Sequence, residues 1–402
     1  MTTQLPHADV AVVGGGVIGL AAAWRARQRG LEVVVLDRGA LGAGTSHAAA
    51  GMLAPVAEAD AQERDLLAHN LESARRWPAF ARELADVTGR DVGYRACGSL
   101  LLARDRDEAE HVERERALRE RLGLRVERLL GSEARRRETA LAPTLRMALA
   151  LPDDHAVEPA RLVAALVAAC ERTGVALRPG AAVDDLAAVP ARRVVVAALI
   201  EACARAGVHL RQHTPVDDLG ALPFERVVVA AGPWSGPLGA GVPVRPVKGQ
   251  ALRLRDPAGP GLCDHVLRFE GGYLVPRGDG RYYLGATVEE RGFDTAVTAL
   301  GVYELLREAA ELLPGLLELE IDEAFAGLRP GTPDNAPIVG TDPRDERVVW
   351  ATGHFRNGIL LSPVTADLVA DELTGARPEH AFRPERFIDD NETVTATEGV
   401  RA

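Results

Sequence analysis

"DVAVVGGGVIGLAAAWRARQRGLEVVVLDRG", residues 9–39, contains an apolar run, a glycine turn, a helix-like stretch and a second apolar run. The first run is typical of a strand buried in a parallel sheet. Gly14, Gly16 and Gly19 form a GxGxxG pattern that permits a tight turn, close approach of a pyrophosphate and packing of the helix on the strand. Asp37 ends the second run, where its carboxylate can accept hydrogen bonds from ribose hydroxyls. Because a helix N-terminus also attracts phosphate, the stretch predicts a dinucleotide-binding unit for FAD or NAD.

The bulk composition narrows the class of protein. The chain has 402 residues and a net charge of −11, which does not favour nucleic acid or an anionic membrane as a partner. Its four cysteines are scattered without a CxxC pair, so we expect neither a disulfide framework nor a metal site, and we expect a cytoplasmic location. We see no secretion signal before the first strand and no apolar run of about 20 residues that would cross a membrane.

The segment after the first unit distinguishes between the two cofactors. "GAGTSHAAAGMLAP", residues 42–55, is small and apolar with two hydroxyl groups, and its composition alone would also fit a plain loop. It resembles the segment that lies along FAD in the D-amino-acid oxidase superfamily, and within that superfamily the glycine oxidases of thiamine biosynthesis. The resemblance covers nearly the whole chain. It implies an α/β fold with a Rossmann-like FAD-binding domain and a second, α+β substrate domain that contains an antiparallel sheet.

Two later segments are expected to return to the FAD domain. "RVVVAAGPWSG" (226–236) has the pattern of a buried strand that ends in a glycine turn, and "VVWATGHFRNGILLSPVTADLVADEL" (348–373) that of a strand, a glycine turn and a helix. The family has nearly the same "GHFRNGI". No cysteine lies in this last segment, so the resemblance implies non-covalent FAD. It assigns FAD contacts to Gly14, Gly16, Val17, Ile18, Gly19, Asp37, Arg38, Thr45, Ser46, Ala50, Gly51, Met52, Val216, Ala231, Gly232, His354, Phe355, Arg356, Asn357, Gly358, Ile359 and Leu360.

Three residues are expected to handle the substrate. "GGYLVPRGDGRYYLGATVEE" (271–290) alternates apolar and polar residues around GDG, which predicts a hairpin with Tyr273 on its first strand. "GLRPGTPDNAPIVG" (327–340) places Arg329, whose planar fork suits a carboxylate, among backbone-shaping residues. The resemblance makes Tyr273 an active-site residue, Arg329 the carboxylate ligand and Arg356 a further substrate contact. Arg277 is expected to be structural.

The resemblance implies oxidation of glycine or another small amino acid or amine by molecular oxygen, yielding the 2-oxo acid, ammonia and hydrogen peroxide for thiazole formation. Two positions depart from the family: Gly271 stands where a histidine is usual, and Val288 where a methionine occurs. These changes alter the pocket walls and leave the preferred amine open among glycine, sarcosine, N-ethylglycine and small D-amino acids. A D-amino-acid dehydrogenase with another electron acceptor and a catalytically silent flavin-binding scaffold are the alternative functions. The oligomeric state is not determined, and a homo-oligomer is one option.

Residues 165–198 and 198–231 form a tandem duplication with an offset of 33 residues, because 21 of their 34 aligned positions are identical. We expect one helix–strand unit to be surplus and the junction around 195–206 to be helical. The adenine contact is assigned to Val216, with Val183 as the alternative. The predicted FAD domain comprises 1–90, 151–235 and 326–385, the substrate domain 91–150 and 236–325, and the tail 386–402. A helix is expected over 56–90, and a strand followed by a charged helix over 101–124.

Overall fold

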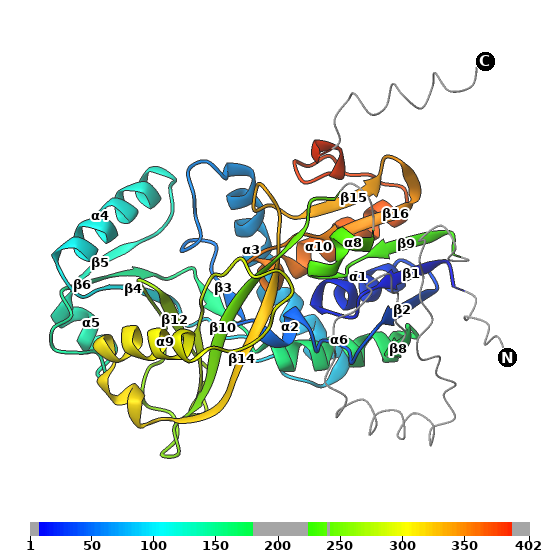
Figure 1. Cartoon of the computed structure of the whole chain (residues 1–402). Coiled ribbons are helices and arrows are strands. Elements are labelled where there is room, and N and C mark those ends of the chain that lie inside the picture. Colours follow the sequence, from blue (N-terminus) through cyan, green and yellow to red (C-terminus); the bar gives the residue numbers. More distant parts are fainter. Residues whose placement is uncertain (1–7, 180–223, 239–241, 388–402) are drawn as a thin grey trace.

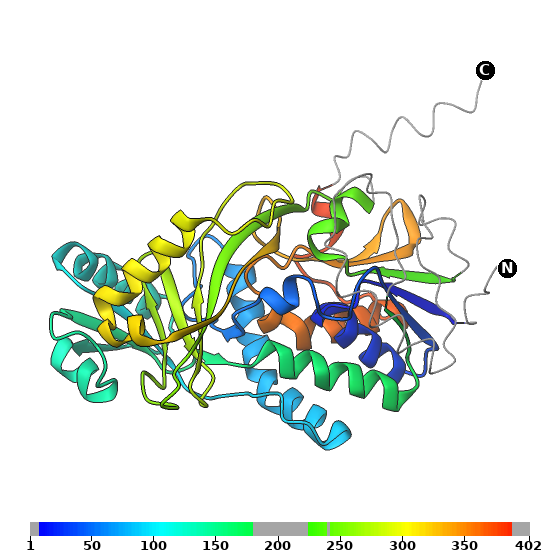
Figure 2. The same ribbon diagram turned by 60° about the horizontal axis from the view of Figure 1, so that its bottom comes forward.

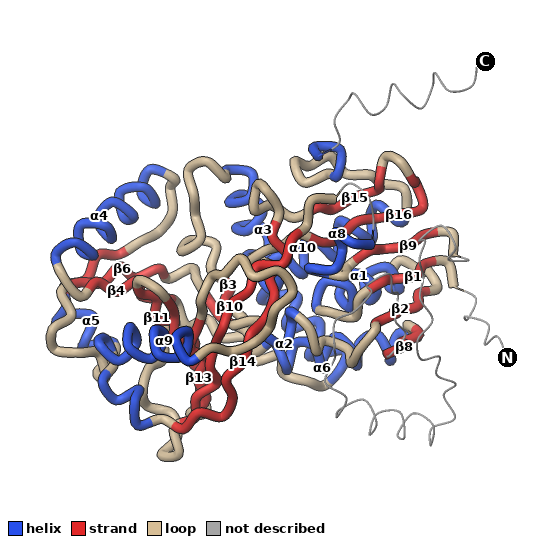
Figure 3. Tube along the Cα trace, in the orientation of Figure 1, coloured by secondary structure: helices blue, strands red, loops and turns tan. Residues whose placement is uncertain are grey.

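The computed structural model describes residues 8–179, 224–238 and 242–387. Two large sheets lie side by side, with helices beside each of them, as Figure 1 shows for the labelled elements. The tube in Figure 3 makes the two sets of strands easy to separate. The strands β10 (Arg245–Arg255) and β14 (Glu320–Gly331) of the eight-stranded sheet lie on its side toward the six-stranded sheet. A small third sheet pairs β3 (Met52–Leu53) with β7 (His155–Ala156). The chain therefore has the predicted α/β architecture.

The six-stranded sheet has the strand order β15-β16-β9-β1-β2-β8. Its members are β1 (Val10–Val13), β2 (Val33–Asp37), β8 (Ala176–Pro179), β9 (Arg226–Val229), β15 (Ile338–Asp342) and β16 (Asp345–Thr352). All neighbours are parallel except the β15–β16 pair, which is antiparallel. Alternate residues of β1 enter different hydrophobic clusters on the two faces of the sheet, as expected for a buried parallel strand. The strand–turn–helix–strand prediction for residues 9–39 is thus confirmed.

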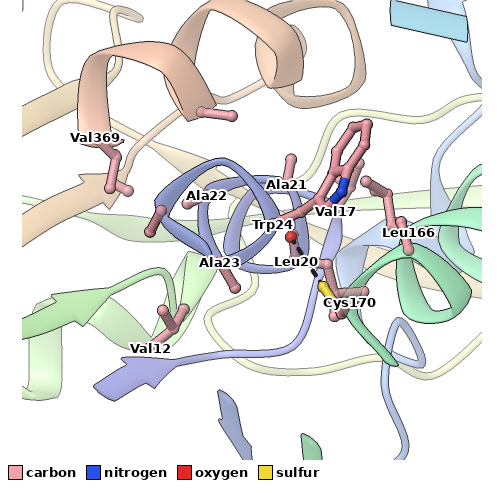
Figure 4. Close-up of a cluster of buried hydrophobic side chains, with 14 of the residues drawn as sticks. Val12, Val17, Leu20, Ala21, Ala22, Ala23, Trp24, Leu166, Cys170 and Val369 are labelled. Atoms are coloured by element: carbon pink, nitrogen blue, oxygen red, sulfur yellow. Dashed lines mark hydrogen bonds between the residues drawn. The ribbon is translucent and has the colours of Figure 1, made fainter. Parts of the chain in front are cut away.

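Four helices build the core beside this sheet. They are α1 (Val17–Gln28), α3 (Arg64–Thr88), α6 (Pro159–Thr173) and α10 (Gly358–Leu373), and Figure 2 shows α1, α6 and α10 from a second side. α1 contacts both α6 and α10, and its small Ala21, Ala22 and Ala23 permit close approach. Figure 4 shows Leu20 and Trp24 of α1 against Leu166 and Cys170 of α6, with the Cys170 thiol 3.4 Å from the Leu20 carbonyl oxygen.

The predicted helix over 56–90 begins too early. α3 starts at Arg64, and the residues before it form turns. The buried Asp154 carboxylate accepts hydrogen bonds from the backbone N–H groups of Val56 (2.9 Å) and Ala57 (3.2 Å). The turn also contains the backbone bonds from Glu58 N to the Ala54 carbonyl and from Ala59 N to the Val56 carbonyl, so residues 54–59 form a separate turn held by Asp154 before α3 begins.

The eight-stranded sheet has the order β14-β10-β13-β12-β11-β4-β6-β5. Its strands are β4 (Ser99–Ala103), β5 (Glu127–Leu130), β6 (Met147–Leu151), β10 (Arg245–Arg255), β11 (Val266–Phe269), β12 (Gly272–Pro276), β13 (Arg281–Gly285) and β14 (Glu320–Gly331). Around it lie α4 (Arg106–Arg121), α5 (Gly131–Arg137), α9 (Ala299–Leu312) and the 3-10 helix η3 (Pro314–Glu318). The hairpin around GDG and the charged helix after β4 are confirmed. The pairs that β10, β11, β12, β13 and β14 form with one another are all antiparallel, as predicted for this part of the chain, and β4 joins them by pairing in parallel with β11.

The strands β10 and β14 form the longest antiparallel pair among the described residues. Its register runs from Arg245↔Gly331 to Arg255↔Glu320. The predicted domain boundary between residues 325 and 326 therefore falls inside one continuous strand, while the division into two domains stays a prediction. The remaining short elements are α2 (Thr45–Ala48), η2 (Gly232–Trp234), α8 (Ser235–Leu238) and η4 (Pro384–Phe387).

The duplication is described only at its ends. Copy one supplies the end of α6 and β8, which pairs with β2, and copy two supplies β9, which pairs with β1. The proposed helix over 195–206 and the two candidate adenine contacts, Val183 and Val216, lie outside the described residues. Of the tail, only its first residues are described, where Arg386 pairs with Asp334.

Candidate functional site

A large cavity opens where the parallel strands of the six-stranded sheet end. The carboxyl ends of β1, β2, β9 and β16 meet at one edge, which is where open α/β sheets bind ligands. The cavity has a volume of about 1800 Å³ and continues along the eight-stranded sheet to α9. Since pockets for drug-sized molecules hold roughly 300–1,000 Å³, this one has room for a dinucleotide and a substrate together.

The glycine turn after β1 forms one wall of the cavity. Gly14 has a φ of 110°, and a Cβ there would overlap the carbonyl of Ala230, which directly follows the neighbouring strand β9. Gly16 precedes α1 without a side-chain cap, and Ser46 Oγ accepts a hydrogen bond from Val17 N at 2.9 Å. Gly19 contacts the Gly14 carbonyl, so it allows α1 to pack on β1 as predicted. The turn thus brings bare backbone and a helix N-terminus to the cavity, as phosphate binding requires.

The acidic residue at the end of β2 also faces the cavity. Each Asp37 carboxylate oxygen accepts one backbone N–H, from Gly15 and from Gly39, at 2.7 Å. Burial raises the pKa of Asp37, and these two hydrogen bonds oppose the rise without cancelling it. Further lone pairs on both oxygens can accept hydroxyl groups. The next residue, Arg38, places its guanidinium 3.7 Å from the centroid of the Trp234 ring.

The predicted FAD-contacting segment around residues 45–52 is held by two side chains of the eight-stranded sheet and by Arg277, which directly follows β12. Its carbonyl oxygens at His47, Ala48 and Ala50 accept hydrogen bonds from Arg253 (2.7 Å), Tyr283 (2.8 Å) and Arg277 (2.9 Å), respectively. Burial lowers the pKa of Arg277 to about 10, and Arg277 also donates to the Val157 carbonyl. Arg277 is therefore structural, as expected. Tyr283 and Arg253 carry no motif, so their roles were not predicted from the sequence.

The segment before α10 closes the opposite wall. His354 is buried and lies 3.0 Å from Thr365 Oγ1 through its Nε2. Burial lowers the pKa of His354 to about 3, so the ring is neutral. Leu360 belongs to the hydrophobic core, and its carbonyl accepts hydrogen bonds from Ser73 and Trp77. These contacts fix the start of α10 against α3.

Arg329 lies on the cavity wall contributed by β14. Its Nη1 donates to the carbonyl oxygens of Thr287 (3.1 Å) and Lys248 (3.3 Å). The guanidinium lies over Gly249 of β10, where a Cβ would come within 2.5 Å of both Nη atoms. Among the described residues, no carboxylate forms an ion pair with Arg329. The cavity therefore presents a cation that is oriented by backbone carbonyl groups and has donors to spare.

Tyr273 and Arg356 occupy the same cavity. The Tyr273 ring stacks on Tyr283 with centroids 6.1 Å apart. The Arg356 side chain is 44% exposed, and its Nη1 lies 3.7 Å from Glu58, which Arg268 already binds at 2.6 Å. Burial would raise the pKa of Glu58, but the charges of Arg268 and Arg356 and the hydrogen bond from Arg268 lower it, so it is ionised.

Glu58 and Arg268 line the cavity and were not predicted. Only the placement of Glu58 shortly after the recognised "AAAGML" segment could have pointed to it. The two departures from the family, Gly271 and Val288, also line the cavity, and Val288 is 55% exposed. These positions can therefore alter what the cavity accepts.

Most predicted site residues meet in this one cavity. Among the described residues, its lining contains every predicted catalytic and FAD-contacting residue except Gly19 and Leu360, which pack behind it. Val216 lies outside the described residues.

In the described ranges, no cluster of three acidic, histidine or cysteine side chains suits a metal ion. Cys97, Cys170 and Cys263 are free thiols. No helix in the described part of the chain has the length and apolar character of a membrane span.

The residues fit FAD on structural grounds. The Gly14 turn removes side chains where a pyrophosphate would approach, α1 begins beside it, and an acidic residue follows β2. Gly14, Gly16, Val17 and Asp37 would hold the nucleotide part. Segments 45–52 and 354–359 would hold the rest, since both line the continuation of the same cavity.

Comparisons with known proteins agree with this geometry. Glycine oxidase of Geobacillus kaustophilus is 36% identical over 379 residues, which cover 93% of this chain and 94% of that protein. Its crystal structure superimposes with a TM-score of 0.80 at 35% identity, covering 94% and 97% of the two chains. The bifunctional protein ThiO/ThiG of Synechocystis is 35% identical over 94% of this chain, which spans 54% of that longer protein. A model of the family described as "FAD dependent oxidoreductase" matches residues 9–372. The chain therefore belongs to the FAD-dependent oxidoreductase family.

Proposed function

We propose that the protein oxidises glycine or another small amino acid with FAD as its bound cofactor. For glycine, the balanced reaction consumes one O₂ and one water and yields glyoxylate, ammonia and hydrogen peroxide. The Cα–N bond of the substrate is first oxidised to an imine, which water then hydrolyses. FAD supplies the acceptor for the two electrons of this step, and molecular oxygen is their final acceptor.

The observation that carries this proposal is the orientation of Arg329. Two backbone carbonyl groups fix its guanidinium on the cavity wall, and its other N–H donors stay available for a ligand. A guanidinium binds a carboxylate through two parallel hydrogen bonds, which set both position and direction of the ligand. Such a clamp would fix the Cα–H of an amino acid relative to the cofactor, which is how an enzyme lowers the entropic part of its barrier.

Tyr273 and Arg356 complete the substrate end of the cavity in this proposal. Tyr273 stacks on Tyr283, so its ring forms a fixed wall beside the carboxylate position. Arg356 is half exposed and loosely paired with Glu58, which suits a residue at the entrance. No general base is needed, because a substrate with a neutral amine can be oxidised without losing a proton first.

Peroxide production by the FAD-loaded protein tests the proposal. Glycine, sarcosine, D-alanine and D-proline serve as substrates, with Arg329→Ala as the variant and Arg245→Ala as the control. Arg245 is an exposed arginine on the same strand pair and does not line the cavity. Its replacement by alanine therefore removes an equal charge outside the cavity. We expect oxygen-dependent turnover, lost in Arg329→Ala mainly through a higher KM and kept in Arg245→Ala.

Other results would favour the two alternatives. Bleaching of the flavin by substrate without peroxide would indicate a dehydrogenase that uses another electron acceptor. Bound FAD that no substrate bleaches, even without oxygen, would indicate a scaffold. The relatives named glycine oxidase and ThiO/ThiG support glycine as the first substrate to test, with thiazole formation in thiamine biosynthesis as the destination of the product. A cytoplasmic location and a homo-oligomer stay predictions from the sequence.

A further inference from the structure

The two carbonyl groups that orient Arg329 come from different segments of the chain. Lys248 belongs to β10, whereas Thr287 follows β13 in the segment that leads to α9. Both carbonyl oxygens accept from the same atom, Arg329 Nη1. The direction of the guanidinium therefore depends on how these two segments are placed relative to each other.

Backbone hydrogen bonds join the two segments along a short stretch. Lys248 and Glu289 exchange N–H···O bonds in both directions, each 2.9 Å long. Thr287 N donates to the Gln250 carbonyl at 3.2 Å, and Gln250 N donates to Thr287 Oγ1 at 2.8 Å. Residues 287–289 thus continue the strand pairing of β13 after Gly285.

The Glu289 side chain is the centre of a polar network that holds this stretch together. Its Oε1 accepts from Thr287 Oγ1 at 2.5 Å and from Gln250 Nε2 at 2.8 Å. Its Oε2 lies 3.7 Å from Lys248 Nζ, which also binds Asp294 at 2.7 Å. Burial would raise the pKa of Glu289, but the bonds from Thr287 and Gln250 and the charge of Lys248 lower it.

Breaking this network would leave the buried ammonium group of Lys248 with fewer partners. The Lys248 side chain is only 1% exposed, and a buried charge needs compensating partners. Glu289 is 23% exposed and Asp294 48% exposed, so Glu289 is the better shielded of the two carboxylates. Loss of its charge would leave Asp294 as the carboxylate partner of Lys248 among the described residues, and a neutral amide oxygen would accept more weakly from Thr287 and Gln250.

We propose that Glu289 is a positioning residue for substrate binding, which fixes the Lys248 and Thr287 carbonyl groups and through them aims Arg329 at the substrate carboxylate. The inference rests on the proposed function, because it assumes that Arg329 binds a carboxylate. Glu289 itself need not contact the substrate. A site that must hold its ligand in one geometry depends on such supporting residues.

The test compares Glu289→Gln with Glu290→Gln in the FAD-loaded protein. Glu290 is the matched control, because it is 62% exposed, pairs only with the exposed Arg245 among the described residues, and does not line the cavity. The probe is acetate, a carboxylate without an amine, and its Kd is read from the change in flavin absorbance. We expect Glu289→Gln to raise this Kd about tenfold, which corresponds to about 1.4 kcal/mol. Glu290→Gln should leave it unchanged, and kcat for the amino-acid substrate should change far less than KM.

A double-mutant cycle with Arg329→Ala separates positioning from general damage. If Glu289 acts through Arg329, Glu289→Gln has little further effect on acetate binding once Arg329 is gone. If Glu289→Gln raises the acetate Kd equally with and without Arg329, or in neither case, the inference is overturned. In either case, a large rise in this Kd for Arg329→Ala alone leaves the proposed function standing. Acetate binding that Arg329→Ala does not weaken overturns both. If Glu289→Gln does not fold, Glu289→Asp takes its place in the cycle, because it keeps the charge on a shorter side chain. We then expect a smaller rise in the acetate Kd, which again disappears without Arg329.

Discussion

Replacing Gly249 with alanine should weaken substrate binding without weakening the fold. A Cβ on Gly249 would lie 2.5 Å from both Nη atoms of Arg329 and 2.7 Å from its Cζ. Non-bonded carbon contacts settle at about 3.5–4.0 Å, so the guanidinium has to move by about 1 Å. Gly249 is not among the described residues with a positive φ, so alanine is sterically allowed on the backbone. The fold loses no packing, because the displaced group is the end of a flexible side chain.

The effect on binding follows from the hydrogen bonds that move with Arg329. Hydrogen bonds to charged groups contribute about 1.5–3 kcal/mol, so losing the aligned pair should raise KM and the Kd of acetate by roughly 10-fold to 150-fold. A displacement of about 1 Å can by itself cost a hundredfold in catalysis. The melting temperature should stay the same or rise slightly, because alanine restricts the unfolded chain more than glycine does.

The assay measures peroxide production, acetate binding and thermal unfolding of Gly249→Ala beside Gly261→Ala. Gly261 is a suitable control, since a Cβ there would meet no atom within 4 Å and its φ is not positive. Unchanged KM and acetate Kd in Gly249→Ala would refute the placement of the carboxylate beside Arg329. A large fall in melting temperature would instead show that the two strands cannot accommodate the methyl group.

Two further substitutions test the support of the site and the fold. Tyr283→Phe removes the 2.8 Å hydrogen bond to the Ala48 carbonyl, so the Kd for FAD should rise by about 2-fold to 10-fold in reconstitution titrations of the apoprotein. Tyr282→Phe, whose hydroxyl accepts from backbone away from the cavity, should leave it unchanged. Burial raises the pKa of Asp154 to about 6 from 3.8, so its contribution to stability is present below pH 4 and is lost as pH rises through 6. The loss amounts to roughly 3 kcal/mol, and urea unfolding of Asp154→Asn should lack this slope between pH 4 and 7. The variant of its half-exposed neighbour, Asp153→Asn, should keep the wild-type slope. Equal slopes for all three proteins would contradict this assignment to Asp154.

The fold was predictable wherever the pattern is local. The strand, glycine turn and helix of residues 9–39 depend on neighbours in sequence, and so does the hairpin around GDG. The start of α3 was predicted too early, because the helix is preceded by a separate turn whose Val56 N–H binds Asp154, 98 residues further along the chain. The parallel pairing of β4 with β11 joins segments that no local pattern relates. Contacts between segments far apart in the chain are therefore the part of the fold that local patterns do not predict.

The residues of the candidate site also differ in whether a local motif identifies them. Arg329, Tyr273 and Arg356 stand in recognisable motifs, and the structure brings all three to one cavity. The pair of Glu58 and Arg268 joins residues 210 positions apart, and neither carries a motif that identifies the other. Roles that arise from such pairs become visible only in three dimensions.

The glycines of β10 and β14 have a role that the sequence did not predict. A glycine beside an arginine in "GLRPGT" suggested backbone shaping, yet Gly327 lies within a strand and faces Gly249 across the pair. A Cβ on Gly249 would meet Arg329, and one on Gly327 would overlap Ala48 of α2. The two glycines therefore provide space on one face of the sheet, on one strand for the arginine and on the other for the segment that lines the FAD cavity. In the proposed site, substrate and cofactor would share a single cavity because neither Gly249 nor Gly327 carries a side chain.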